Sequence, residues 1–193
     1  MLKELYKIIG ETPIDKTALT NLIPILKELD ELDFCHPAHC YGVLDHSAKA
    51  AETLEDVFLR LVMIFHDVGK LTTATKVANR KDASRDVTKF PGHQQESVRI
   101  AKSLLGDELG TADLAIFLKL IEYHDTSLVV GNNREVMQQL MQDYGVDFVG
   151  NLLKVQRADM STHDKKYYEV LIKSALDRTC DIYEEEKAKT DRK

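Results

Sequence analysis

Apolar side chains recur along most of this chain at intervals of three and four residues, the spacing of one face of a helix. No alternation of apolar and polar residues is long enough to predict a strand. Near the C-terminal end the apolar stripe consists of Tyr168, Leu171, Ile172, Ala175 and Ile182. The pattern predicts helices over Leu2–Ile9, Lys16–Leu29, Val43–Glu55, Val57–Asp67, His93–Leu105, Thr111–His124, Asn133–Asp143, Asp147–Met160 and roughly Asp164–Lys187.

These helices predict one all-α domain, a helical bundle with helical extensions at both ends. We expect N-terminal helices in residues 1–34, a core over 35–163 and a C-terminal helix in 164–193. Thr111, with an acid two residues later, is the expected N-cap of its helix. The longest irregular piece, Leu71–Pro91, is rich in Thr, Asn, Asp, Ser and Lys, and a loop of that length is typical of a functional or mobile segment.

Composition narrows the class of protein. Hydrophobic residues make up 44% of the 193 residues, enough for a core, and no segment approaches the apolar length of a membrane span. The charged, amphipathic start differs from a signal peptide, and three irregularly placed cysteines form no disulfide framework, so we expect a cytoplasmic protein. The net charge of −6 argues against general nucleic-acid binding and suits a protein that binds cations.

The segment Leu59–Lys70, with the sequence LRLVMIFHDVGK, is apolar on nearly every face before it reaches His66 and Asp67. Such a helix is normally buried. An imidazole and a carboxylate at its end would be costly to desolvate without a partner. His and Asp are common ligands of divalent cations, so the pair predicts a metal site.

Other histidines and acids stand near the ends of separate, largely apolar helices. Taken one at a time, each is more often an ordinary cap or surface residue. Together they match the way in which helical bundles build metal sites from side chains on facing helices. The candidates beyond His66 and Asp67 are His46, His93, His124 and Asp159.

The order of these residues resembles the HD superfamily of metal-dependent phosphohydrolases. More narrowly, it is similar to the HD domain attached to bacterial CCA-adding tRNA nucleotidyltransferases. The matching phrases lie between Cys35 and His163: HPAHCYGVLDHSAKAAE, LVMIFHDVGKLTTAT, KFPGHQQESVRIAKSLL, LIEYHD and LLKVQRADM. No paired-carboxylate strand motif precedes them, so tRNA end-building is not implied.

The resemblance implies an HD-type core and a ligand set. One metal would be held by His46, His66, Asp67 and Asp159. His93 and His124 match the pair that binds a second metal in dinuclear members, with Asp67 bridging. Imidazole-rich ligation favours Mn, Fe, Co, Ni or Zn, as one ion or two. Two cations would lower the pKa of a shared water and neutralise charge on the phosphate.

The resemblance also places residues near the substrate. Lys70 would lie beside the phosphate, with Asp67 and Lys70 as the catalytic pair, although a cation at a helix C-terminus is the alternative for Lys70. His39 is expected at the rim of the site, and Lys89 is a weaker phosphate contact.

Several polar residues admit more ordinary explanations. A separate zinc site within residues 35–40 is the less favoured one, because its four ligand types are crowded into six residues. His36 and His163 are expected at the surface. Asp125 would either support His124 or be exposed, and Arg157 would pair with an acid or contact substrate.

We therefore expect hydrolysis of a small phosphorylated substrate, a phosphomonoester or phosphodiester of a nucleotide or RNA end. Two alternatives remain open at this point. One is a module that uses a structural ion to dock RNA or protein. The other, within the same superfamily, is a (p)ppGpp or deoxynucleoside triphosphate hydrolase.

Overall fold

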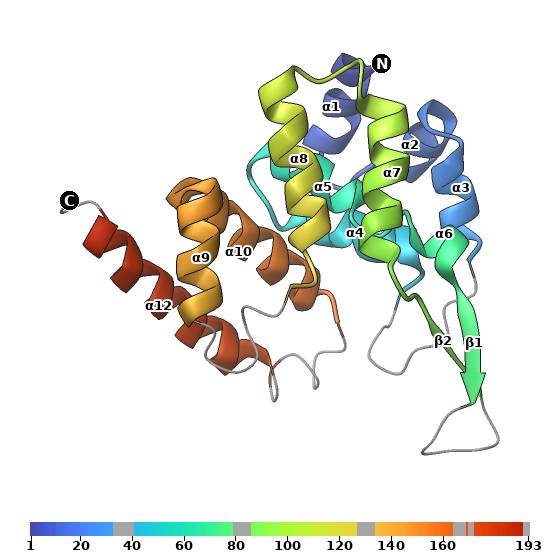
Figure 1. The fold of residues 1–193 in the computed structure, drawn as a ribbon. Coiled ribbons are helices and arrows are strands. Elements are labelled where there is room, and N and C mark those ends of the chain that lie inside the picture. Colours follow the sequence, from blue (N-terminus) through green and yellow to red (C-terminus); the bar gives the residue numbers. More distant parts are fainter. Residues whose placement is uncertain (33–40, 79–85, 127–133, 164–168, 170–171, 191–193) are drawn as a thin grey trace.

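The computed structural model describes residues 1–32, 41–78, 86–126, 134–163, 169 and 172–190. The predicted all-α fold is confirmed: helices pack into a bundle, from which one short hairpin projects (Figure 1). The helices are α1 (Leu2–Gly10), α2 (Lys16–Leu22), α3 (Ile25–Asp30), α4 (Val43–Glu52), α5 (Val57–Phe65), α6 (Lys70–Thr73), α7 (His93–Leu105), α8 (Thr111–Tyr123), α9 (Arg134–Tyr144), α10 (Val146–Ser161) and α12 (Lys173–Thr190).

Helix α5 lies at the centre of the bundle, as its apolar sequence predicts. It contacts α1, α4, α8 and α10. Its start is capped by Asp56, whose carboxylate accepts a hydrogen bond from Phe58 N (2.8 Å). Near its end, the Phe65 and Phe117 rings meet edge to face with their centres 6.0 Å apart, which joins α5 to α8. The end of α5 is therefore held from several sides, and the His66-Asp67 pair follows there.

The N-terminal helices share the same buried core, which extends from Leu5 of α1 to Ala158 of α10. The single helix predicted over residues 16–29 is wrong, since α2 ends at Leu22 and α3 begins at Ile25. Pro24 lies between them and has no N–H for a continuing helix. The division of the chain into N-terminal helices, core and C-terminal helix stays a prediction.

The segment predicted as one long loop, residues 71–91, contains regular structure. Helix α6 opens it, and strands β1 (Thr75–Ala78) and β2 (Asp86–Lys89) pair antiparallel, with Thr75 opposite Lys89 and Val77 opposite Val87. The hairpin extends away from the helices in Figure 1. The prediction that no strand is present was therefore wrong, because four-residue strands are too short to show a reliable alternation.

Towards the C-terminus, α10 crosses the bundle and contacts α4, α5, α8, α9 and α12. The predicted N-cap of α8 was wrong: Gly110 occupies that position, and Thr111 is the first helical residue. Within the described ranges, no helix is both long and apolar enough to cross a membrane. Helix α10 thus connects the elements that carry the histidines to the C-terminal pair α9 and α12.

Candidate metal centre

The His66-Asp67 pair lies in the turn after α5, and both side chains are buried. This turn is held tightly against α7. Gly69 N donates to Ser97 Oγ (2.9 Å), and a Cβ atom at position 69 would lie 2.3 Å from the carbonyl oxygen of His93. Only glycine permits so close an approach. The glycine of the HDVGK phrase therefore brings the start of α7 beside Asp67.

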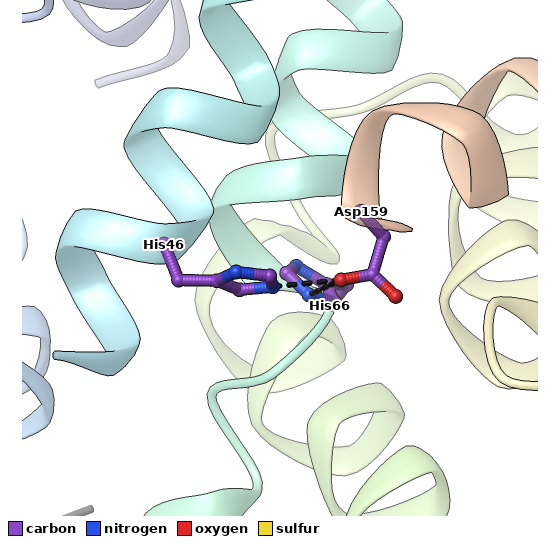
Figure 2. Close-up of side chains that lie close together, drawn as sticks. All are labelled: His46, His66 and Asp159. Carbon is purple, nitrogen blue, oxygen red and sulfur yellow. Dashed lines mark hydrogen bonds and ion pairs between the residues drawn. The ribbon is translucent and has the colours of Figure 1, made fainter. Parts of the chain in front are cut away.

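Three helices bring His46, His66 and Asp159 together (Figure 2). His46 projects from α4, His66 follows α5, and Asp159 lies in the last turn of α10. The Nε2 atoms of His46 and His66 lie 2.7 and 3.6 Å from Asp159 Oδ1. One ligand-type atom from each residue lies within 4.8 Å of the others, so these three side chains can hold one cation.

A second group of ligands shares His66 and consists of His66, Asp67 and His124. Asp67 Oδ2 lies 3.2 Å from His66 Nε2. Asp67 Oδ1 faces the other way, 3.4 Å from His93 Nε2 and 3.8 Å from His124 Nε2. The Nε2 atoms of His93 and His124 are 3.3 Å apart. The Asp67 carboxylate thus lies between His66 on one side and the His93–His124 pair on the other.

The ring nitrogens that face away from the cluster share one arrangement in three of the four histidines. Each Nδ1 atom contacts the backbone carbonyl three residues earlier, and a carbonyl oxygen can only accept. The Nδ1–H therefore donates, which leaves the lone pair of a neutral ring on Nε2, inside the cluster. The three contacts are His66 Nδ1 to Met63 O (2.6 Å), His93 Nδ1 to Phe90 O (3.0 Å) and His124 Nδ1 to Ile121 O (2.6 Å).

Two buried atoms of the cluster indicate that a metal would fit. His66 Nε2 and Asp67 Oδ1 are buried and form no hydrogen bond within the described part of the chain. Leaving such atoms unsatisfied in a core is costly. A divalent cation would satisfy both, and a set of imidazole nitrogens and carboxylate oxygens suits first-row transition ions. The residues present therefore fit a divalent metal, without selecting one element.

The cluster of ligand candidates holds two carboxylates in their charged forms, and these in turn hold a proton on His66. Burial alone would lower the pKa of His66, but Asp67 and then Asp159 outweigh it and raise that pKa from 6.5 to about 10. Burial would raise the pKa of both carboxyls, yet the histidines beside them hold each pKa well below 3.8. Burial, followed by the charge of His66, lowers the pKa of His124 to about 4. Two ionised carboxylates and a neutral His124 at pH 7 are the forms that bind metal, and a metal at His66 Nε2 would displace the proton that the carboxylates hold on that ring.

Lys70 lies at the edge of this cluster. It is the first residue of α6, and its Nζ donates to Asp67 Oδ2 at 2.6 Å. The Nζ atom also lies 5.4 Å from the centre of the Phe90 ring, which favours a cation there. Its contact with a phosphate stays a prediction.

Other predicted site residues are not placed in the cluster. His39 lies outside the described residues together with Cys35, His36 and Cys40, so the rim and zinc interpretations stay predictions. Lys89 ends β2 with an exposed side chain. Its proposed phosphate contact also stays a prediction.

Asp125 and Arg157, for which the sequence left two roles open, both lie among the described residues. Asp125 is exposed, the second of its two expected roles, and its carboxylate accepts from Gln94 Nε2 (3.1 Å), while His124 Nδ1 contacts Ile121 O. Arg157 is exposed and lines two hollows of about 500 and 560 Å³ beside α10. Neither hollow is lined by a residue of the cluster.

Two further residues reach the cluster without having been predicted. His163, expected at the surface, is half-buried, and its ring stacks on His46 with centres 5.7 Å apart and planes 23° apart. That expectation was wrong. Thr162 Oγ1 lies 2.8 Å from His46 Nδ1. Both residues directly follow α10, but only the packing of α10 on α4 brings them to His46.

Comparison with known proteins identifies a family for this chain but no individual relative. The family model of the HD domain matches residues 38–159, which span every ligand candidate described above. Searches of curated proteins and of solved structures gave no significant match, so the narrower likeness to the tRNA nucleotidyltransferase domain gains no support. The matched region covers well over half of the chain and contains a buried His/Asp cluster of the expected composition. The chain therefore belongs to the HD-domain family, within the superfamily of metal-dependent phosphohydrolases.

Proposed function

We propose that this protein is a phosphohydrolase that requires a divalent transition metal and hydrolyses a phosphomonoester or phosphodiester. One observation carries the proposal: two groups of ligand atoms share the buried His66, and two buried atoms of the cluster, His66 Nε2 and Asp67 Oδ1, form no hydrogen bond among the described residues. Buried polar atoms without a partner are expensive unless they serve to bind a ligand such as a cation. A catalytic role gives that cost a purpose.

In this proposal, the first ion is held by His46, His66, Asp67 and Asp159. A second ion would use Asp67 together with His93 and His124. When bound, the metal supplies Lewis acidity, which activates water and neutralises charge on the phosphate. The Asp67 carboxylate has one oxygen toward each histidine group, as a bridging ligand requires.

Lys70 provides a positive charge that belongs to the protein and not to the metal. Its ammonium already lies 2.6 Å from an oxygen of Asp67, with only a small part of its side chain exposed. A phosphate oxygen that approached Asp67 would meet this cation in a partly desolvated place, where charge–charge attraction is stronger than in water. We therefore assign Lys70 to substrate phosphate and retain Lys89 and His39 as further candidate contacts.

The openness of the cluster favours an enzyme over a structural ion site. His66 and Asp67 have exposed side-chain fractions of 0% and 2%, whereas Asp159 and His93 reach 15% and 11%. Within the described residues, the cluster thus meets solvent on one side. A structural ion is normally enclosed by its ligands, while a catalytic ion keeps a position open.

The substrate class that we propose is a small phosphorylated compound, such as a nucleotide, or the phosphate of an RNA end. The resemblance of the five sequence phrases supports this choice, and the net charge of −6 argues against a broad grip on nucleic acid. Hydrolysis of (p)ppGpp or of deoxynucleoside triphosphates is the alternative within the superfamily.

The test combines metal analysis with a substrate panel. Protein purified without chelator is analysed for Mn, Fe, Co, Ni and Zn and assayed with each metal on nucleotide mono-, di- and cyclic phosphates and phosphorylated RNA ends. Asp67→Ala should lose both metal and hydrolysis. Asp45→Ala is the matched control, because Asp45 directly precedes His46 in α4 but pairs with Lys16 (2.6 Å). Equal metal content in wild type and Asp67→Ala would refute the proposal.

A further inference from the structure

The four histidines of the cluster differ in how their outward nitrogens are held. His66 and His124 are C-cap residues and His93 opens its helix, so each finds a backbone carbonyl three residues earlier. His46 lies inside α4, where backbone carbonyls accept hydrogen bonds from amides of the following turn. Its ring therefore needs a partner from another part of the chain.

Thr162 supplies this partner from the C-terminal end of α10. Its Oγ1 lies 2.8 Å from His46 Nδ1 and also 2.8 Å from the carbonyl oxygen of Asp159. Thr162 is the C-cap residue of α10 and is buried, so water competes little for its hydroxyl. One hydroxyl thus contacts both a predicted ligand, His46, and the backbone of another, Asp159.

Counting protons assigns the direction of these contacts. A hydroxyl has one proton, and the Asp159 carbonyl can only accept it. The geometry allows that proton to go to the carbonyl, and in that arrangement the hydroxyl oxygen accepts from His46 Nδ1–H. The Nε2 atom of neutral His46 then has its lone pair toward Asp159 Oδ1, only 2.7 Å away. In that tautomer the two acceptor atoms need a metal ion beside them, whereas without metal a proton on Nε2 would join them.

We propose that Thr162 is a positioning residue that holds His46 in the tautomer able to bind metal through Nε2. The inference rests on the proposed function, since it concerns a ligand of the same centre. It assigns to Thr162 the role that backbone carbonyls have for the other three histidines. Outer contacts of this kind commonly change metal affinity by about 10- to 100-fold when they are removed.

The test compares Thr162→Val, which keeps the shape and removes the hydroxyl, with Thr162→Ser, which restores it. The dissociation constant for zinc is measured by competition with a chelating dye. Thr162→Val should bind zinc about 10- to 100-fold more weakly, and Thr162→Ser should bind it nearly as wild type does. Thr179→Val is the control, because Thr179 is buried in α12 and its hydroxyl donates to Ala175 O (2.8 Å).

A second measurement reads the tautomer directly. Nitrogen NMR of ¹⁵N-histidine protein loaded with zinc should show the His46 proton on Nδ1, exchanging slowly with water in wild type and faster in Thr162→Val. A wild-type proton on Nε2, or zinc affinity unchanged in a folded Thr162→Val, would overturn the inference. A wild type that binds no metal through His46 would instead refute the proposed function, while the NMR result would still decide the role of Thr162.

Discussion

Two buried carboxylates, Glu186 and Asp67, are surrounded by their neighbours in opposite ways. Between α9 and α12, the Glu186 carboxylate accepts hydrogen bonds from Arg134, from Gln138 Nε2 (2.9 Å) and from Lys189 Nζ (2.7 Å). In the His/Asp cluster, Asp67 Oδ1 and His66 Nε2 are buried without a hydrogen bond among the described residues. One group is complete in itself, and the other is not.

This difference distinguishes a carboxylate with a structural role, Glu186, from a candidate ligand-binding site. The donors around Glu186 come from the chain itself, so its negative charge is neutralised as the helices pack. The His/Asp cluster combines two carboxylates with rings that burial tends to hold neutral, as for His93 and His124. A cation that binds this cluster in the folded state would add to stability by mass action. Buried charge alone therefore does not indicate function, whereas buried charge without sufficient partners does.

The largest expected effect comes from His66→Ala, because His66 belongs to both ligand groups. Metal content should fall to background, and hydrolysis should fall by about 10³-fold or more, since the transition state loses its cations. Glu186→Ala should leave both quantities unchanged. Elemental analysis and steady-state kinetics on the two variants make the comparison; retention of bound metal by His66→Ala would contradict it.

The next prediction distinguishes a cluster that binds one ion from a cluster that binds two. If two ions bind, His93→Ala and His124→Ala should each remove one ion and reduce kcat by about 10²- to 10³-fold, while the fold and the first ion remain. If one ion binds, both variants should keep the wild-type metal content and differ in KM or kcat. Metal stoichiometry beside kinetics distinguishes the cases. A wild-type content that never exceeds one ion per chain under metal-replete conditions would exclude the two-metal centre.

Removal of the metal should lower the stability that depends on the His/Asp cluster and leave the contribution of Glu186 unchanged. A ligand present at 100 times its dissociation constant stabilises the folded state by about 2.7 kcal/mol. For a chain of this size, we expect chelation to lower Tm by about 5–10 °C. Glu186→Gln should show the same loss on chelation as wild type, whereas His66→Ala should show none. Thermal unfolding followed by circular dichroism, with and without chelator, provides the measurement.

The smallest predicted effect is a pH dependence at Glu186. Hydrogen bonds from Lys189, then from Gln138 and Arg134, lower the pKa of Glu186 from 4.5 to about 2. A lowered pKa in the folded state contributes stability above pH 4.5, and this contribution is lost as pH falls from 4.5 to about 2. Glu186→Gln should therefore lower Tm by a few degrees at pH 7 and converge with wild type in acid. A difference that stays constant from pH 7 to pH 3 would contradict the assignment.

Much of the helical framework could be predicted, because periodic burial is a local property of the sequence. Helix α7 matches its predicted bounds, and the predicted start of α5 at Val57 is confirmed. The break at Pro24 was visible in the sequence and was missed. The β1–β2 hairpin was missed for a different reason, since strands of four residues gain their order from pairing with each other rather than from their own pattern.

For the centre itself, the sequence determined the chemical types of the ligands: histidines and aspartates at the ends of apolar helices. Tertiary structure decided which ligand atoms face one another and which groups hold them. The approach of Gly69 to α7, the stacking of His163 on His46 and the hydroxyl of Thr162 all join residues that are distant in sequence. Periodicity reports which face of a helix is buried, but the partner on that face depends on how helices pack against each other.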